Sequence, residues 1–100
     1  MKKKVIIIGG GVAGMQTALR LAEQGVEPTI IEKEAELGGK LRAWHVLFPS
    51  FTPAQEVLTE LRRRINEGGI GVLTSTEVQG FTKNSVTLSD GRTLTCDSVV

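Results

Sequence analysis

The apolar residues near the N-terminus change their period at a cluster of glycines. Residues 5–8 form a continuous β-branched run, which is typical of a strand buried on both faces of a parallel sheet. In residues 12–24 the apolar positions fall on one helical face, and Gly25 supplies a helix stop. Pro28 then leads into a second short strand over residues 29–31. This pattern predicts a strand, a glycine turn, a helix and a second parallel strand, which together make a βαβ unit.

The next segment, residues 32–51, shows no clear period. The absence of a period predicts a long loop, and a loop of this length in a compact domain is usually functional. A second helix is expected to start at Thr52, a suitable N-cap, with Pro53 at its first position and a glycine pair at its end. Residues 72 and 73 then form the core of a third parallel strand.

The last third of the chain has a different sequence pattern. Asp90 and Gly91 lie between two segments in which apolar and polar residues alternate, and an Asp-Gly pair in this setting predicts a β-hairpin. Residues 96–100 read as the entry to another buried strand, and the chain stops inside this apolar run. An antiparallel β-meander is expected from three short segments rich in Thr and Val, at residues 77–81, 85–88 and 92–95.

These elements predict an α/β fold. It is Rossmann-like, with a parallel sheet, two helices and an antiparallel β-meander. The expected strand order is third, second, first and then the C-terminal strand. Because the chain stops within an apolar run, residues 1–100 are expected to be an incomplete dinucleotide-binding domain that continues beyond residue 100 in a longer protein.

Composition excludes several classes of function. The 100 residues carry 12 Lys and Arg against 11 Asp and Glu, and a net charge of +1 argues against a nucleic-acid binder that neutralises phosphates. One cysteine excludes an internal disulfide, a redox pair and a multi-cysteine metal site. No apolar run approaches the roughly 20 residues that span a bilayer, so we expect no membrane partner and a cytoplasmic protein.

The glycine cluster supplies the first candidate chemistry. Gly9, Gly11 and Gly14 stand in a GxGxxG pattern that follows a predicted strand and opens a predicted helix. The first glycine permits the tight turn, the second lets a pyrophosphate approach the backbone, and the third lets helix and sheet pack closely. The helix N-terminus then offers free N–H groups to the phosphates.

An acidic residue completes this pattern. Glu32 ends the second predicted strand, 18 residues after Gly14, where a carboxylate accepts hydrogen bonds from ribose hydroxyls. Its charge disfavours the 2′-phosphate of NADP, while the neighbouring Lys33 is expected to point the opposite way. In the alternative interpretation, the glycines merely build a turn and Glu32 is a solvated strand end.

Two stretches of sequence resemble a known superfamily. The first stretch is VIIIGGGVAGMQTALRLAEQG, and it is followed by IIEKEAELGGKLR. Together they resemble the FAD-binding segment of flavoproteins with two dinucleotide-binding domains. This superfamily includes pyridine nucleotide-disulfide oxidoreductases and amine-oxidase-like enzymes. The resemblance implies that the glycine pair and the residues after it lie along the FAD pyrophosphate, and that Val78 meets the adenine ring. The expected cofactor-binding residues are Gly9, Gly11, Val12, Ala13, Gly14, Glu32, Lys33, Gly38, Gly39, Lys40, Arg42 and Val78.

A narrower likeness covers about twenty residues. LGGKLRAWHVLFPSFTPAQEVL is similar to the corresponding region of flavoproteins that resemble the A subunit of heterodisulfide reductase, in which a Phe-Pro segment precedes cysteines. Here no cysteine lies between Pro49 and Cys96, which argues against an iron–sulfur ligand in this stretch. Cys96 itself is expected to be a small buried apolar residue, and His45 a polar surface residue.

The resemblance implies an FAD-dependent oxidoreductase. The longer protein is expected to pass electrons between NAD(P)H and an unidentified acceptor, with the cofactor supplying the redox chemistry and this chain supplying no catalytic or metal-binding side chain. The 100-residue chain alone is expected to be inactive. Two alternatives are an NAD-binding dehydrogenase domain and a non-catalytic dinucleotide-binding module. An exposed sheet edge is also expected to favour self-association.

Overall fold

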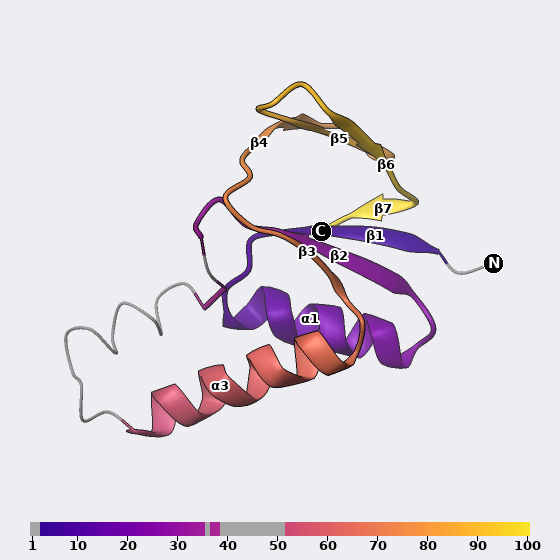
Figure 1. Cartoon of the computed structure of the whole chain (residues 1–100). Coiled ribbons are helices and arrows are strands. Elements are labelled where there is room, and N and C mark those ends of the chain that lie inside the picture. The colour runs from indigo at the N-terminus through magenta and orange to yellow at the C-terminus, as the bar shows by residue number, and fades with distance from the viewer. Residues whose placement is uncertain (1–2, 36, 39–51) are drawn as a thin grey trace.

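A computed structural model describes residues 3–35, 37, 38 and 52–100, with side chains in the second helix described from Glu56 onward. Two helices and seven strands make up this part of the chain (Figure 1). In chain order the elements are β1 (Lys4–Ile8), α1 (Val12–Glu23), β2 (Glu27–Ile31), α3 (Thr52–Glu67), β3 (Gly71–Leu73), β4 (Val78–Phe81), β5 (Ser85–Leu88), β6 (Thr93–Thr95) and β7 (Ser98–Val99).

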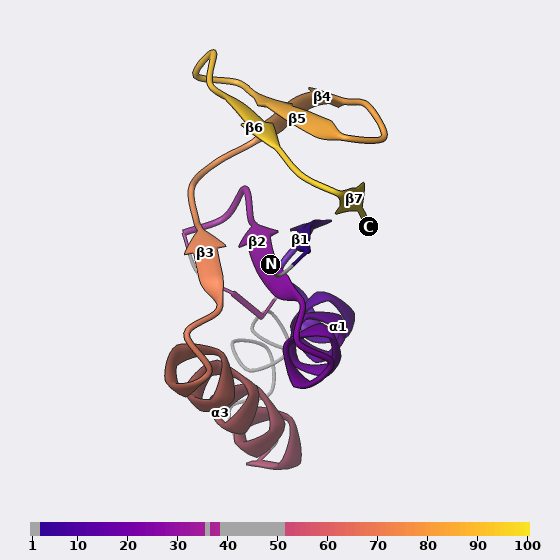
Figure 2. The same cartoon turned by 90° about the vertical axis from the view of Figure 1, so that its right-hand side faces the viewer.

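The strands form two sheets. One is parallel, with the order β3-β2-β1-β7, and the other is antiparallel, with the order β4-β5-β6. Both helices cover one face of the parallel sheet, and the antiparallel meander lies over the opposite face (Figures 1 and 2). The predicted fold class and strand order are therefore confirmed.

This layering explains the continuous apolar run of β1. Val5 and Ile7 belong to the core cluster under the helices, whereas Ile6 belongs to the cluster under the meander. In the neighbouring strand β2, Ile30 and Ile31 divide between the same two clusters. Because both faces of the sheet are covered, both sets of side chains are apolar.

The boundaries differ from the sequence prediction by one or two residues, as is usual where elements fray. The most informative difference is that β2 begins at Glu27 and includes Pro28. The Glu27 N–H donates to the Lys3 carbonyl at 2.8 Å, so the backbone nitrogen of Pro28 faces the side of β3. Pairing with β3 begins only at Thr29 and Gly71, so the missing N–H of the proline costs the sheet no hydrogen bond.

Among the described strands, β3 and β7 form the two edges of the parallel sheet. Self-association through such an edge stays a prediction. Within the described residues, neither helix combines the length and the apolar character needed to cross a bilayer.

Packing of α3 on the sheet can be tested with two substitutions in the same helix. Ile65 is 1% exposed in the cluster under the helices, whereas Val57 is 45% exposed. We expect Ile65→Ala to lower the free energy of unfolding by about 2–5 kcal/mol, because it leaves a cavity. Val57→Ala should change it by less than about 0.5 kcal/mol. Urea denaturation of both variants measures this difference, and equal losses would contradict the described packing.

Candidate functional site

A glycine turn joins β1 to α1 at the carboxyl end of the parallel sheet. Gly9 has a φ of +106°, a conformation that a side chain would strain, and its N–H donates to the Ile31 carbonyl of β2 at 2.8 Å. Gly11 is the N-cap of α1 and makes no side-chain capping bond, and the first turn of this helix holds no acidic residue. The positive end of the helix dipole is therefore left for an external anion.

Two glycines of this turn face very different surroundings. A Cβ on Gly14 would lie 2.1 Å from the Gly9 carbonyl oxygen, so only glycine lets the helix pack against the turn. A Cβ on Gly11 would meet nothing within 4 Å. The backbone at Gly11 is therefore open to a group approaching from outside.

Gly10 makes contacts that the sequence motif did not indicate. Its N–H donates to Glu32 Oε1 at 2.7 Å, and its carbonyl accepts a hydrogen bond from the Gly38 N–H at 2.9 Å. A Cβ on Gly10 would lie 2.3 Å from Leu37 Cδ2. The GxGxxG pattern leaves this position free, so the only signal in the sequence was the run of three glycines.

Glu32 is held from several sides. Its side chain is buried, with the residue 8% exposed, and Oε2 accepts a hydrogen bond from the Glu34 N–H at 2.8 Å. Its backbone N–H donates to the Leu73 carbonyl at 2.8 Å, and its carbonyl accepts from the Thr76 N–H at 3.0 Å. This placement excludes the solvated strand end of the alternative interpretation. Glu32 instead ties the glycine turn to the ends of β2 and β3.

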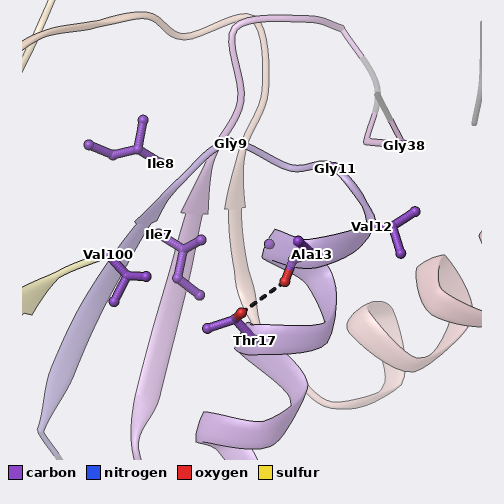
Figure 3. A pocket seen from close by; sticks show the side chains of 10 residues that line it. Ile7, Ile8, Gly9, Gly11, Val12, Ala13, Thr17, Gly38 and Val100 are labelled. Atoms are coloured by element: carbon purple, nitrogen blue, oxygen red, sulfur yellow. Dashed lines mark hydrogen bonds between the residues drawn. The ribbon is translucent and has the colours of Figure 1, made fainter. Parts of the chain in front are cut away.

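A cavity of about 670 Å³ opens beside the turn (Figure 3). It lies within the size range of small-molecule and cofactor sites. The Thr17 hydroxyl at its wall donates to the Ala13 carbonyl at 2.8 Å (Figure 3). Six of the predicted site residues line it, namely Gly9, Gly11, Val12, Ala13, Gly14 and Gly38. The sequence did not point to four others, Ile7, Ile8, Thr17 and Val100, whose apolar or small side chains carry no signal of a site.

Two other predicted residues, Lys33 and Val78, do not line this cavity. Lys33 is exposed, and Val78 packs against the cluster under the meander rather than lining the cavity. Cys96 is half-buried against the same cluster. Within the described residues, no group of His, Cys, Asp and Glu is arranged to hold a metal ion. Gly39, Lys40, Arg42 and His45 lie outside the described residues.

Comparison with known proteins identifies the family. The family described as NAD(P)-binding Rossmann-like domain matches residues 7–64, which contain the glycine turn, α1, β2 and most of α3. The chain belongs to this family. Its members share a βαβ unit with the glycine turn at the carboxyl end of the sheet, the arrangement just described.

Two curated relatives match most of the chain. The iron-sulfur A subunit of a CoB–CoM heterodisulfide reductase from Methanopyrus kandleri is 36% identical over 80 residues, which is 79% of this chain and 12% of that protein. The NAD-dependent dihydropyrimidine dehydrogenase subunit PreT of Escherichia coli is 43% identical over 75 residues, which is 75% of this chain and 18% of that protein. These matches confirm the resemblance to heterodisulfide reductases and agree with a pyridine nucleotide-disulfide oxidoreductase-like superfamily. The chain spans less than a fifth of either relative.

A solved structure shows the same fold. The tetrameric form of 2-methyl-3-hydroxypyridine-5-carboxylic acid oxygenase superposes with a TM-score of 0.79 at 17% sequence identity, covering 98% of this chain and 38% of that one. At this identity the similarity establishes the fold alone.

The two glycine environments predict unequal effects on stability. Gly14→Ala places a methyl group on the Gly9 carbonyl and must move helix or turn, so we expect a loss of about 1–3 kcal/mol in the free energy of unfolding. Gly11→Ala has open space and should cost less, about 0.5–1 kcal/mol, because alanine is less favourable than glycine at an N-cap. Thermal or urea unfolding monitored by circular dichroism compares the two variants. A destabilised Gly11→Ala beside an unchanged Gly14→Ala would contradict the turn geometry.

A second pair tests the Glu32 contacts. Glu32→Gln keeps the shape but places an NH₂ group against one of the two backbone N–H donors, so we expect a loss of about 1–3 kcal/mol. Glu34→Gln removes the same charge from an exposed neighbour and is the matched control. Urea midpoints at constant salt measure both. Equal effects would mean that net charge, rather than the two hydrogen bonds, accounts for the change.

Proposed function

We propose that this chain binds the ADP half of FAD at the glycine turn. The observation that carries the proposal is the open backbone at Gly11, which lies at the N-terminus of α1 and in the wall of the cavity. The phosphates approach the chain there because no Cβ blocks them and the first helical N–H groups lack intrahelical acceptors. Gly9, Val12, Ala13, Gly14 and Gly38 lie in the same wall.

The adenosine would lie toward the end of β2. Each carboxylate oxygen of Glu32 accepts one backbone N–H bond and keeps further lone pairs that can accept from ribose hydroxyls. The same charge disfavours a 2′-phosphate at this position. The Thr76 N–H bond to the Glu32 carbonyl holds the segment that leads into Val78 close by, which supports a role for Val78 beside the adenine. We assign Lys33, Gly39, Lys40 and Arg42 to the cofactor on the resemblance alone.

The longer protein would be an FAD-dependent oxidoreductase that moves electrons between NAD(P)H and an unidentified acceptor. The flavin, when bound, supplies the redox chemistry. The described residues of the site hold and orient the nucleotide and supply no acid, base or nucleophile, so the chain alone is not expected to catalyse. The names of the two relatives, a heterodisulfide reductase and an NAD-dependent dehydrogenase, support an oxidoreductase.

Two alternatives use the same turn. In an NAD-binding dehydrogenase domain, NAD replaces FAD. A dinucleotide-binding module without catalysis would bind the cofactor for sensing or interaction alone. The second glycine segment at Gly38, which lines the cavity, and the meander favour FAD over a plain dehydrogenase domain.

A parallel titration with FAD, NADH and NADPH tests the proposal. We expect saturable quenching of flavin fluorescence and a rise in melting temperature with FAD, corresponding to about 2.7 kcal/mol when FAD is at 100 times its Kd. NADH and NADPH should stabilise the chain less. Gly11→Ala should weaken FAD binding by about tenfold or more while lowering the melting temperature of the free protein only slightly, because its methyl group enters the open space that the phosphates would occupy.

The other outcomes separate the alternatives. Preferential stabilisation by NADH would favour the dehydrogenase domain. Absence of binding by all three dinucleotides at millimolar concentration would overturn the proposed site.

A further inference from the structure

Arg62 reaches the candidate site from the helix that follows it in the sequence. This half-buried residue of α3 donates from Nε to the Leu37 carbonyl at 3.2 Å, and from Nη2 to the same oxygen. Two N–H groups of one planar guanidinium thus converge on a single backbone acceptor. Hydrogen bonds from a charged donor are shorter and stronger than those between neutral groups.

The carbonyl that Arg62 holds belongs to the same peptide group as the Gly38 N–H. That N–H donates to the Gly10 carbonyl at 2.9 Å. One peptide plane is therefore fastened at both ends, by α3 on one side and by the glycine turn on the other. The charge on the guanidinium polarises the peptide, which strengthens the bond that its N–H makes to Gly10.

The orientation of this peptide decides how the cavity wall is built. Gly38 lines the cavity and has a φ of +127°, which favours glycine. A Cβ on Gly38 would lie 2.8 Å from Leu58 Cδ1, so the residue is pressed against α3. Because the carbonyl of Leu37 and the N–H of Gly38 already have partners, this peptide contributes a shaped wall rather than a free hydrogen-bonding group.

We propose that Arg62 is a positioning residue for the dinucleotide: it fixes the Leu37–Gly38 peptide in the orientation that lets Gly38 line the cofactor cavity. The inference rests on the proposed FAD site and adds a determinant of affinity that lies outside the glycine motifs. Arg62 is not among the residues that line the cavity, and the contact through which it would act on the cofactor is its hydrogen bond to this peptide.

The same helix offers a matched control. Arg63 and Arg64 are exposed, and neither has a described hydrogen bond to the Leu37–Gly38 peptide. Arg63 donates to Glu60 and Glu67, and its hydrogen bond lowers the pKa of Glu60. Arg64 makes a longer ion pair, 3.7 Å, with Glu23, so Arg64→Met removes the same charge with less rearrangement.

The test combines binding with a readout at the peptide itself. In the ligand-free chain, amide hydrogen exchange by NMR reports whether the Gly38 N–H stays bonded, and FAD titration gives Kd. For Arg62→Met we expect Gly38 exchange to rise and Kd to weaken, each by about tenfold, since a hydrogen bond to a charged group accounts for at least that factor. Arg64→Met should stay within about twofold on both. Arg62→Lys keeps the charge but loses the two-pronged contact, and should weaken Kd by about threefold.

The outcomes distinguish the two proposals. If FAD binds the parent chain and Arg62→Met changes neither Gly38 exchange nor Kd beyond twofold, the role of Arg62 is wrong while the FAD site stands. If the parent chain binds no FAD, the proposed site fails, and the role of Arg62 toward the dinucleotide fails with it. Should Arg62→Met not fold, Arg62→Lys decides. Faster Gly38 exchange with weaker binding supports the proposal, and parent-like values for both overturn it.

Discussion

The two hydrogen bonds of Gly10 hold the site together. Its N–H binds the carboxylate of Glu32 at the end of β2, and its carbonyl binds the N–H of Gly38 in the following segment. These partners lie 22 and 28 residues away in the sequence. A side chain at Gly10 would collide with Leu37, so this junction forms only because the residue is glycine.

The layered fold delivers these segments to one place. The carboxyl ends of parallel strands all lie at the same end of the sheet, so the turn after β1, Glu32 after β2 and the segment after β3 converge there. The helices bury one face of the sheet and the meander buries the other, which stabilises the sheet that carries the site (Figure 2). The site is thus a property of backbone placement rather than of reactive side chains.

In the proposed site the protein positions the cofactor. The glycine turn offers an open backbone and the positive end of a helix, Glu32 offers acceptors, and Gly38 offers a wall held in place by α3 through Arg62. This agrees with the family described as NAD(P)-binding Rossmann-like domain.

The sequence by itself determined the βαβ unit, the strand order and the glycines of the turn, because these depend on local period, on β-branched runs and on positions that exclude a Cβ. It also placed Glu32 at the end of β2 but could not show that backbone N–H groups hold both of its oxygens. Only the tertiary structure revealed the contacts of Gly10 and Arg62. Their partners are backbone atoms of distant segments, and every residue has such atoms, so no pattern of side chains predicts which of them will meet.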